Sequence, residues 1–339
     1  MAKSKQPQIR QYILRLIGKN AEGIVEKTTE AFQISKSTVY SYLADLKAEG
    51  VIEKREGAYR LCGTVHTFTY SIEAGSSLGE DRIYRTDIKP LLADLPENVA
   101  KIWRYAFTEM MNNAIEHASA KNILCAVKTD PVKTTVLIAD DGVGIFRKIR
   151  DFMKMQSGEE IPLAECASFL LAGKFTTAKE GHSGEGIFFT SHMMDEFLII
   201  SDEIVFTRNN FRDEQMQLAT PYGSTIVQMT LANQTTKTTL EVFNRFSDVE
   251  DGFFRTQIPV AHMFPDGGPV SRSEARRLGE ILPKFKEAVL DFANVDDVGQ
   301  AFVHELFVVW QRNHPDIRLK VENACDDVLW MIRRVQATK

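Results

Sequence analysis

The sequence predicts an α+β protein built from three segments, residues 1–64, 65–233 and 234–339. In the first segment, three stretches with helical spacing of apolar residues precede two short strands. In the second, strands occur in antiparallel pairs while the helices are grouped separately, which favours α+β over a doubly wound sheet. In the third, strand and helix follow in the order βαβα. A length of 339 residues also suits two or three domains.

Composition and cysteine usage limit the class of protein. Hydrophobic residues make up 44% of the chain and charged residues 26%, which is typical of a globular protein with a sizeable core. No apolar run approaches a membrane span, and the start, MAKSKQPQIRQ, lacks the apolar stretch of a secretory signal. The four cysteines form no CxxC pair, which argues against zinc and fits a reducing cytosol. We therefore expect a cytoplasmic protein that has no membrane partner.

Charge is distributed unevenly along the chain. Residues 1–62 contain 11 Lys and Arg against 7 Asp and Glu, a balance of +4. The other residues contain 30 against 39, a balance of −9. Because residues 1–62 are basic and the rest of the chain is acidic, any contact with nucleic acid is expected in residues 1–62.

The first segment predicts three helices followed by a hairpin. IRQYILRLIGK forms the first helix, and a second helix follows it. Ser35 or Ser37 is a suitable N-cap for the third helix, and Gly50 can end that helix in a left-handed turn. VIEKREGAYRL then predicts two strands around the pair Glu56-Gly57.

This order resembles a winged helix-turn-helix. In that fold the third helix enters the major groove and the wing lies against phosphates. The resemblance implies DNA contacts by polar and basic side chains at the start of the third helix and in the wing, namely Lys36, Ser37, Thr38, Tyr40, Lys54 and Arg55. A protein-binding module with solvated polar faces is the alternative.

The second segment contains a long helix with an unusual polar stripe. The helix is expected from about Pro96 to Ala118, and it includes FTEMMNNAIEHA. Glu109, Asn113 and His117 are spaced four residues apart, so they project from one face. A helix that only packs does not need an acid and an amide in one stripe. His117 is more typical of a helix-end dipole partner than of a ligand.

Three glycine motifs follow this helix in chain order. TTVLIAD leads into DDGVGI at 140–145, GHSGEGI occupies 181–187 before a helix, and GST at 223–225 opens the last strand. Each motif alone is weak. Together and in this order, they resemble the ATP-binding fold of type II topoisomerases, heat-shock chaperones, histidine kinases and mismatch-repair ATPases, the GHKL superfamily. The resemblance covers about 95–232 and implies a Bergerat-type α/β sandwich.

The resemblance implies ATP and Mg²⁺ as ligands and gives roles to named residues. Asn113 would coordinate the Mg²⁺, and Asp140 would accept a hydrogen bond from the adenine amino group. Glu109 would polarise the attacking water, a contribution of roughly 10²–10⁴-fold for a general base. Gly142 and Gly144 would let the backbone pass close to the nucleotide, and Gly181, Gly184 and Gly186 would form the lid hinge and a helix N-terminus that faces the phosphates. Lys174, or alternatively Lys179, would contact the phosphates. Thr225, or alternatively Ser224, would lie near the base. Without the resemblance, Glu109 could be a surface acid paired with Arg104 or Lys101, and DDGVGI a hairpin turn.

The third segment carries LDFANVDDVGQAFVHELF followed by LKVENACDDVLWMIRR. These stretches resemble a STAS-like domain of unknown function. In anti-anti-sigma factors a phosphorylated serine begins the helix after the LDF-like strand. Here that region is Gly299, Gln300 and Ala301, which offer no hydroxyl. The resemblance therefore implies an interaction or regulatory role, with a protein partner left open, and Asp296 and Asp297 are interpreted as turn and N-cap residues.

The combined interpretation is an ATP-binding, ATP-hydrolysing and DNA-binding regulatory switch of prokaryotes. ATP with Mg²⁺ would order the lid between about Leu171 and Gly186 and change the packing of the flanking domains. One alternative is an anti-sigma-type serine/threonine protein kinase that acts on a separate partner, because that family also has an acid in the helix motif. Another is a non-hydrolysing, ATP-dependent interaction module. A homodimer is left open, and residues 63–95 leave no room for the phosphoacceptor hairpin of a sensor histidine kinase.

Overall fold

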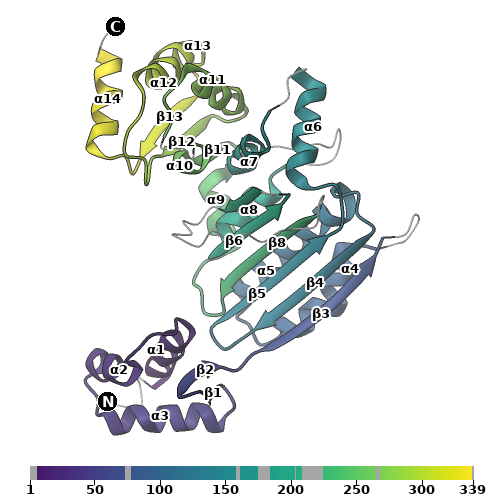
Figure 1. Cartoon of the computed structure of the whole chain (residues 1–339), viewed down its shortest axis with the longest axis vertical. Coiled ribbons are helices and arrows are strands. Elements are labelled where there is room, and N and C mark those ends of the chain that lie inside the picture. The colour runs from purple at the N-terminus through teal and green to yellow at the C-terminus, as the bar shows by residue number, and fades with distance from the viewer. Residues whose placement is uncertain are drawn as a thin grey trace.

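The computed structural model describes residues 6–72, 78–157, 161–174, 184–202, 204–207, 224–264 and 268–337. Three parts follow one another along the long axis of the molecule (Figure 1). Three helices and a hairpin lie at one end, a six-stranded sheet with its helices lies in the middle, and a three-stranded sheet with its helices lies at the other end. Among the described residues, no helix combines the length and the apolar character needed to cross a bilayer.

The amino-terminal part contains the predicted three helices and hairpin. Ser35 is the N-cap of the third helix, because its side chain accepts a hydrogen bond from the Thr38 amide. Gly50 has a φ of 73°, and Glu56 and Gly57 form the left-handed turn between the two strands. The elements are α1 (Gln6–Gly18), α2 (Ile24–Phe32), α3 (Lys36–Ala48), β1 (Ile52–Arg55) and β2 (Ala58–Leu61).

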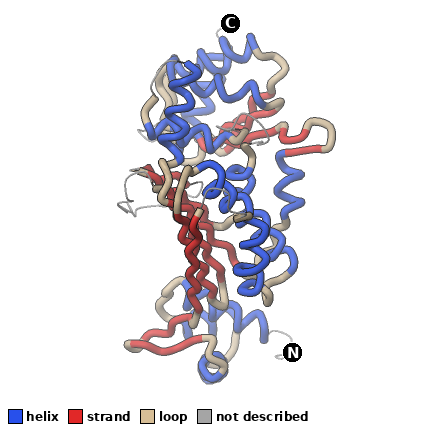
Figure 2. Tube along the Cα trace, turned by 90° about the vertical axis from the view of Figure 1, so that its right-hand side faces the viewer, coloured by secondary structure: helices blue, strands red, loops and turns tan. Residues whose placement is uncertain are grey.

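The middle part is a mixed helix-and-sheet unit, as predicted. Its six strands pair only with antiparallel neighbours, and Figure 2, which views the sheet along its edge, shows helices on one face. Alternate side chains of the central strands are buried, and Trp103 and Phe107 of the long helix are fully buried with them. The strand order is β3 (Thr64–Ser71), β4 (Asn122–Thr129), β5 (Lys133–Asp140), β8 (Thr225–Ala232), β6 (Glu196–Ser201) and β7 (Ile204–Thr207).

The sequence interpretation missed several helices of this part. The predicted long helix is α5 (Glu97–Asn112), which continues into the π-helical turn η4 (Asn113–His117), and the helix after Gly184 is α8 (Gly186–Met193). The missed elements flank these two: α4 (Glu80–Ile83), η2 (Tyr84–Ile88), η3 (Lys89–Leu92), α6 (Ile145–Ser157) and α7 (Leu163–Ala172).

The carboxyl-terminal part contains the predicted βαβα order and one further parallel strand. The order starts at β12 (Glu287–Asp291), and the unpredicted strand β11 pairs with its other edge. The helix after β12 is capped by Gly299, so Asp297 is not its N-cap; the Asp297 carboxylate instead accepts from the Val298 amide at 2.7 Å. The remaining elements are α9 (Thr239–Phe246), β9 (Ser247–Asp248), β10 (Gly252–Phe253), β11 (Arg255–Pro259), α10 (Val260–Met263), α11 (Arg272–Ile281), η5 (Leu282–Lys284), α12 (Gln300–His304), η6 (Glu305–Trp310), α13 (Gln311–Asn313), β13 (Arg318–Glu322) and α14 (Asp326–Ala337).

The buried hydrophobic residues of the described ranges form two clusters. One is confined to the amino-terminal part and contains Ile13, Val39 and Leu43. The other runs without interruption from the middle part into the carboxyl-terminal part. The predicted boundary between residues 233 and 234 stays a prediction, because the core is continuous across it.

Candidate functional site

A cavity of about 270 Å³ lies between the long helix, the sheet and three other helices of the middle part. The carboxyl-terminal half of α5 and η4 line it, and α6, α7 and α8 each contribute side chains to its wall. The cavity gathers seven of the residues predicted from the sequence: Glu109, Asn113, Asp140, Gly144, Gly184, Gly186 and Thr225.

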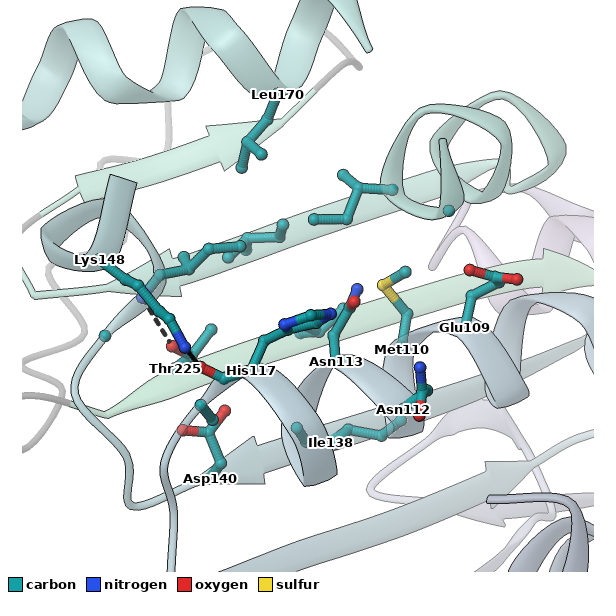
Figure 3. A pocket seen from close by; sticks show the side chains of 18 of the residues that line it. Glu109, Met110, Asn112, Asn113, His117, Ile138, Asp140, Lys148, Leu170 and Thr225 are labelled. Carbon is teal, nitrogen blue, oxygen red and sulfur yellow. Dashed lines mark hydrogen bonds between the residues drawn. The ribbon is translucent and has the colours of Figure 1, made fainter. Parts of the chain in front are cut away.

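The two carboxylates stand at opposite ends of this cavity. In Figure 3, Glu109 lies at one end and Asp140 at the other, with Asn113 and His117 between them. The two ends therefore offer different chemistry to one elongated ligand. Such an arrangement suits a molecule with a hydrogen-bond donor at one end and a hydrolysable group at the other.

The helix that carries Glu109 and Asn113 changes its geometry inside the site. It is α-helical to Asn112 and π-helical over Asn113–His117, and the Ala118 amide bonds to the Asn113 carbonyl at 3.1 Å. A π turn holds one more residue than an α turn, so the even spacing of four expected for the polar stripe ends at Asn113. Single π turns inside α-helices are frequent at functional sites.

Glu109 lies against the start of α8. A Cβ placed on Gly186 would be only 2.1 Å from Glu109 Oε2, so any larger residue there would displace the Glu109 carboxylate. Gly186 is the first residue of an eight-residue helix, whose free backbone N–H groups favour negative charge. The acid and the helix N-terminus thus share one end of the cavity.

Asp140 ends the central strand β5 at the other end of the cavity. Only 8% of its surface is exposed, and it faces Thr225 across the β5–β8 pair. Its Oδ1 accepts from the Gly142 amide at 2.9 Å. Burial raises the pKa of Asp140 to about 6, although hydrogen bonds from Gly142 and Thr225 oppose this effect. A buried acceptor of this kind suits a donor group on a planar ligand.

The neighbouring Asp141 has a structural role. Its carboxylate accepts from the Lys121 and Asn122 amides at 2.7 and 2.9 Å and from the Asn122 side chain at 2.8 Å. These hydrogen bonds lower the pKa of Asp141. Within the pair, only Asp140 lines the cavity.

The two glycines of DDGVGI pack against protein atoms. A Cβ on Gly142 would lie 2.2 Å from the Ala118 carbonyl oxygen, and one on Gly144 would lie 2.9 Å from Asp202 Oδ2. Gly144 also has a φ of 85°. Their expected approach to a nucleotide stays a prediction, but both glycines are needed by the fold itself.

The hydroxyl of Thr225 helps to anchor the next helix. The Ile145 amide donates to Thr225 Oγ1 and to Ser201 Oγ, both at 3.2 Å. Ser201 in turn donates to the Ser224 carbonyl at 3.1 Å. Thr225 therefore fixes the first turn of α6 while it lines the cavity.

Sequence reasoning missed the cavity residues that come from α6 and α7. The Lys148 ammonium donates a hydrogen bond to the His117 carbonyl, and burial lowers the pKa of this lysine. Leu170 of α7 and Ile149 of α6 add apolar surface to the wall. An apolar periodicity after DDGVGI was the available signal for α6, since IFRKIRDF repeats apolar residues at helical spacing.

Of three further residues predicted for the lid, one lies away from the cavity and two lie outside the described residues. Lys174 does not line the cavity; its ammonium donates to the Lys284 carbonyl at 3.0 Å and lies over the rings of Phe253 and Phe285. Gly181 lies outside the described residues, as does Lys179.

The predicted DNA contacts lie on α3 and the β1–β2 hairpin. Tyr40 is 55% exposed, and the Lys54 ammonium lies over the Tyr59 ring. Lys36 pairs with Glu26 at 2.9 Å and Arg55 with Glu53 at 2.7 Å, all on the surface. Ser37 and Thr38 share hydrogen bonds with the N-cap hydroxyl of Ser35.

Two protein-family models match the chain. Residues 85–205 match the histidine kinase-like ATPase domain, and residues 274–329 match the STAS-like domain of unknown function (DUF4325). A search of curated proteins finds no match. The chain therefore contains a GHKL-type ATPase domain, which supports ATP binding in general, and a STAS-like domain, as the resemblances implied.

Proposed function

We propose that this protein, whose middle part is a histidine kinase-like ATPase domain, is an ATP-hydrolysing regulatory switch that binds DNA through its amino-terminal part. The observation that carries the proposal is the single cavity that joins Glu109, Asn113 and Asp140. These residues come from a helix and a strand that are separate in the sequence, and they offer an acid, an amide and a buried acceptor in one row.

The Asp140 end supports recognition of adenine. A buried carboxylate is stabilised when a ligand donates a hydrogen bond to it, and the adenine amino group is such a donor. Ile138, Ile199 and Val227 give this cavity apolar surface for a flat ring. The adenine amino group would add a hydrogen bond to those that Asp140 already accepts from the backbone, and this further stabilisation of the buried charge favours binding.

The Glu109 end supports binding of phosphates with Mg²⁺. The N-terminus of α8 can donate backbone N–H groups to phosphate oxygens. Mg²⁺ prefers oxygen ligands and is commonly held by one or two protein groups together with substrate phosphates. Asn113 lines the cavity and offers one amide oxygen as a ligand. In the described part of the chain, no group of three or more His, Cys, Asp or Glu could hold a metal by itself. A metal shared with the nucleotide therefore fits the residues present.

Glu109 is the proposed general base. Its carboxylate lies beside the first residue of α8, where the terminal phosphate would be bound. A water placed to attack that phosphate would therefore be within reach of the Glu109 carboxylate. The bound Mg²⁺ would neutralise charge on the phosphates. Glu109 would accept the proton of the attacking water.

A short connection supports coupling between the ATPase domain and the DNA-binding part. Strand β2 ends at Leu61, and β3, the edge strand of the large sheet, begins at Thr64. Gly63 between them is packed closely, because a Cβ there would lie 2.6 Å from the Thr129 carbonyl oxygen. A hairpin held by a short, packed joint moves with the sheet that it is attached to.

A calorimetric titration with ATP and Mg²⁺ tests the first half of the proposal. Wild-type protein should bind, and Asp140→Asn should bind much more weakly. Absence of binding by the wild-type protein at millimolar ATP would refute the proposal. Labelled γ-phosphate then separates the activities, because free phosphate indicates an ATPase and label on a second protein indicates a kinase.

DNA affinity measured without nucleotide and with saturating ATP tests the switch. A ligand shifts a conformational equilibrium only by its different affinity for the two forms, so the two DNA affinities should differ. Equal affinities would remove the regulatory half of the proposal and leave two independent sites.

A further inference from the structure

We infer that the carboxyl-terminal part is a structural component of the nucleotide cavity, and that Thr256 and Lys284 are positioning residues that act on it through α7 and α8. This inference rests on the proposed function of the cavity. It assigns a defined mechanical role to the carboxyl-terminal part, which holds two walls of the cavity although none of the described residues that line the cavity belongs to it.

The first wall is held at the end of α7. The hydroxyl of Thr256, on strand β11, donates to the carbonyl of Ala172 at 2.6 Å, and Thr256 is completely buried. Ala172 is the last residue of α7, and the carbonyl groups in the last turn of a helix have no hydrogen-bond partner within the helix. Leu170, two residues earlier, lines the cavity. The bond from Thr256 therefore fixes the axial position of a helix that carries a wall residue.

The turn after α7 is fixed from the same side. Gly173 has a φ of 78°, and a Cβ on it would lie 2.8 Å from the Phe253 ring of strand β10. The next residue, Lys174, donates to the Lys284 carbonyl at 3.0 Å, while Lys284 donates to the Lys174 carbonyl at 3.2 Å. The two lysines thus form a reciprocal clasp between the end of the first wall and η5.

Aromatic rings hold the second wall. Phe188 and Phe189 are both in α8, directly after Gly186 and Ile187, which line the cavity. Phe253 of strand β10 lies 4.6 Å from Phe188 and 5.0 Å from Phe189, measured between ring centroids. These contacts belong to the core that is continuous between the two parts, and Figure 1 shows α7 and α8 on the side of the middle part that faces it.

Phe253 therefore touches both walls, since it packs against Gly173 after α7 and against Phe188 in α8. A ligand that changes the spacing of α7 and α8 must also change the packing around Phe253. Coupling between two sites is reciprocal in free energy. A partner bound to the carboxyl-terminal part would consequently change nucleotide affinity by the same factor by which nucleotide changes affinity for that partner.

Four variants of the full-length protein test the inference by titration with ATP and Mg²⁺. Thr256→Val removes the hydroxyl and keeps the shape, and Thr256→Ser restores the hydroxyl. Lys284→Met removes the bond of the clasp that the exposed Lys284 ammonium donates and keeps the Lys284 carbonyl, and Lys286→Met is its control because Lys286 is also exposed and pairs with Asp251 instead. Thr256→Val and Lys284→Met should each weaken ATP binding by roughly 3- to 30-fold, the range for residues that modulate coupling. Thr256→Ser and Lys286→Met should bind as the wild-type protein does.

Thermal unfolding of each variant gives the folded fraction, so a loss of fold by Thr256→Val is separated from a loss of affinity. If that variant unfolds, Lys284→Met still decides the question. Hydrogen exchange adds a second readout, since saturating ATP should slow exchange of amides in β11 and η5 of the wild-type protein. Wild-type ATP affinity in both folded variants, with exchange in β11 and η5 unchanged by ATP, would overturn the inference. Failure of the wild-type protein to bind ATP would instead refute the proposed function.

Discussion

The carboxylate of Glu109 packs against the backbone of Gly186, so closely that a Cβ on Gly186 would lie 2.1 Å from Oε2 and 3.1 Å from Cδ of the acid. The acid belongs to α5 and the glycine begins α8, so this contact joins two helices of the cavity wall. A larger residue at the start of α8 would therefore displace this carboxylate, whether or not a ligand is bound. The contact also places the proposed general base beside the N-terminus that would bind the terminal phosphate.

We predict that Gly186→Ala lowers ATP turnover more than it lowers ATP affinity. The added methyl group would push the Glu109 carboxylate away from its present position, and misplacement of a catalytic group by about 1 Å can cost about 10²-fold. The adenine end is unaffected. Single-turnover hydrolysis and a binding titration measure the two effects, with Gly79→Ala as control because nothing lies within 4 Å of a Cβ there. Equal losses in affinity and turnover would argue against a specific effect on Glu109.

We predict that Glu109→Gln keeps ATP binding and loses hydrolysis. The amide has the same shape but cannot accept the proton of the attacking water, so turnover should fall by roughly 10²–10⁴-fold. Phosphate release under single-turnover conditions checks this directly. Turnover equal to that of the wild-type protein would exclude Glu109 as the base while leaving the nucleotide site in place.

Asp140 should make both stability and affinity depend on pH. Its pKa is about 6 in the folded protein against 3.8 ordinarily, so the folded form binds more protons between these values. Stability therefore falls as pH rises from about 4 to about 6, and at neutral pH the buried charge costs up to about 3 kcal/mol. Asp140→Asn should accordingly raise the unfolding temperature of the ligand-free protein at pH 7.5 and have little effect at pH 3.5.

Asp141→Asn provides the comparison for this prediction. Hydrogen bonds that Asn122 donates to the Asp141 carboxylate lower the pKa of Asp141, so this group contributes stability that is present at neutral pH and is lost as pH falls. Its removal should lower the unfolding temperature at pH 7.5, which is opposite to the change for Asp140. Equal changes for the two neighbours would contradict the assignment of the buried charge to Asp140.

The affinity for ATP should weaken as pH falls through about 6. Protonated Asp140 no longer offers a charged acceptor to the adenine amino group. Titrations at pH 5 and pH 7.5 measure the effect, and the pH dependence should be absent from Asp140→Asn. A pH dependence that persists in this variant would place the titrating group elsewhere.

Most of the fold could be predicted from the sequence because its strands and long helices carry regular apolar periods. The polar stripe of α5 and the glycine motifs also identified seven of the 20 described residues that line the cavity, including both carboxylates. The sequence does carry a signal for Lys148, because IFRKIRDF has the apolar repeat of α6. The placement of Lys174 has no local signal, because it lies over Phe253 and Phe285, which are distant in the chain. The continuity of the core between two parts depends on such long-range contacts, and no local pattern reports it.

We predict that Lys54→Gln combined with Arg55→Gln weakens DNA binding across different sequences and leaves ATP affinity unchanged. Both side chains are exposed on the hairpin, where the proposed wing would meet phosphates. For every phosphate that is no longer neutralised, the negative slope of log affinity against log salt concentration should become less steep by about 0.9. Filter binding or fluorescence anisotropy at several salt concentrations measures that slope. Lys101→Gln is the control, because this lysine pairs with Glu97 on the surface of the ATPase domain. An unchanged slope in the double variant would favour a protein-binding role for the amino-terminal part, since the basic hairpin would then make no contact with phosphate.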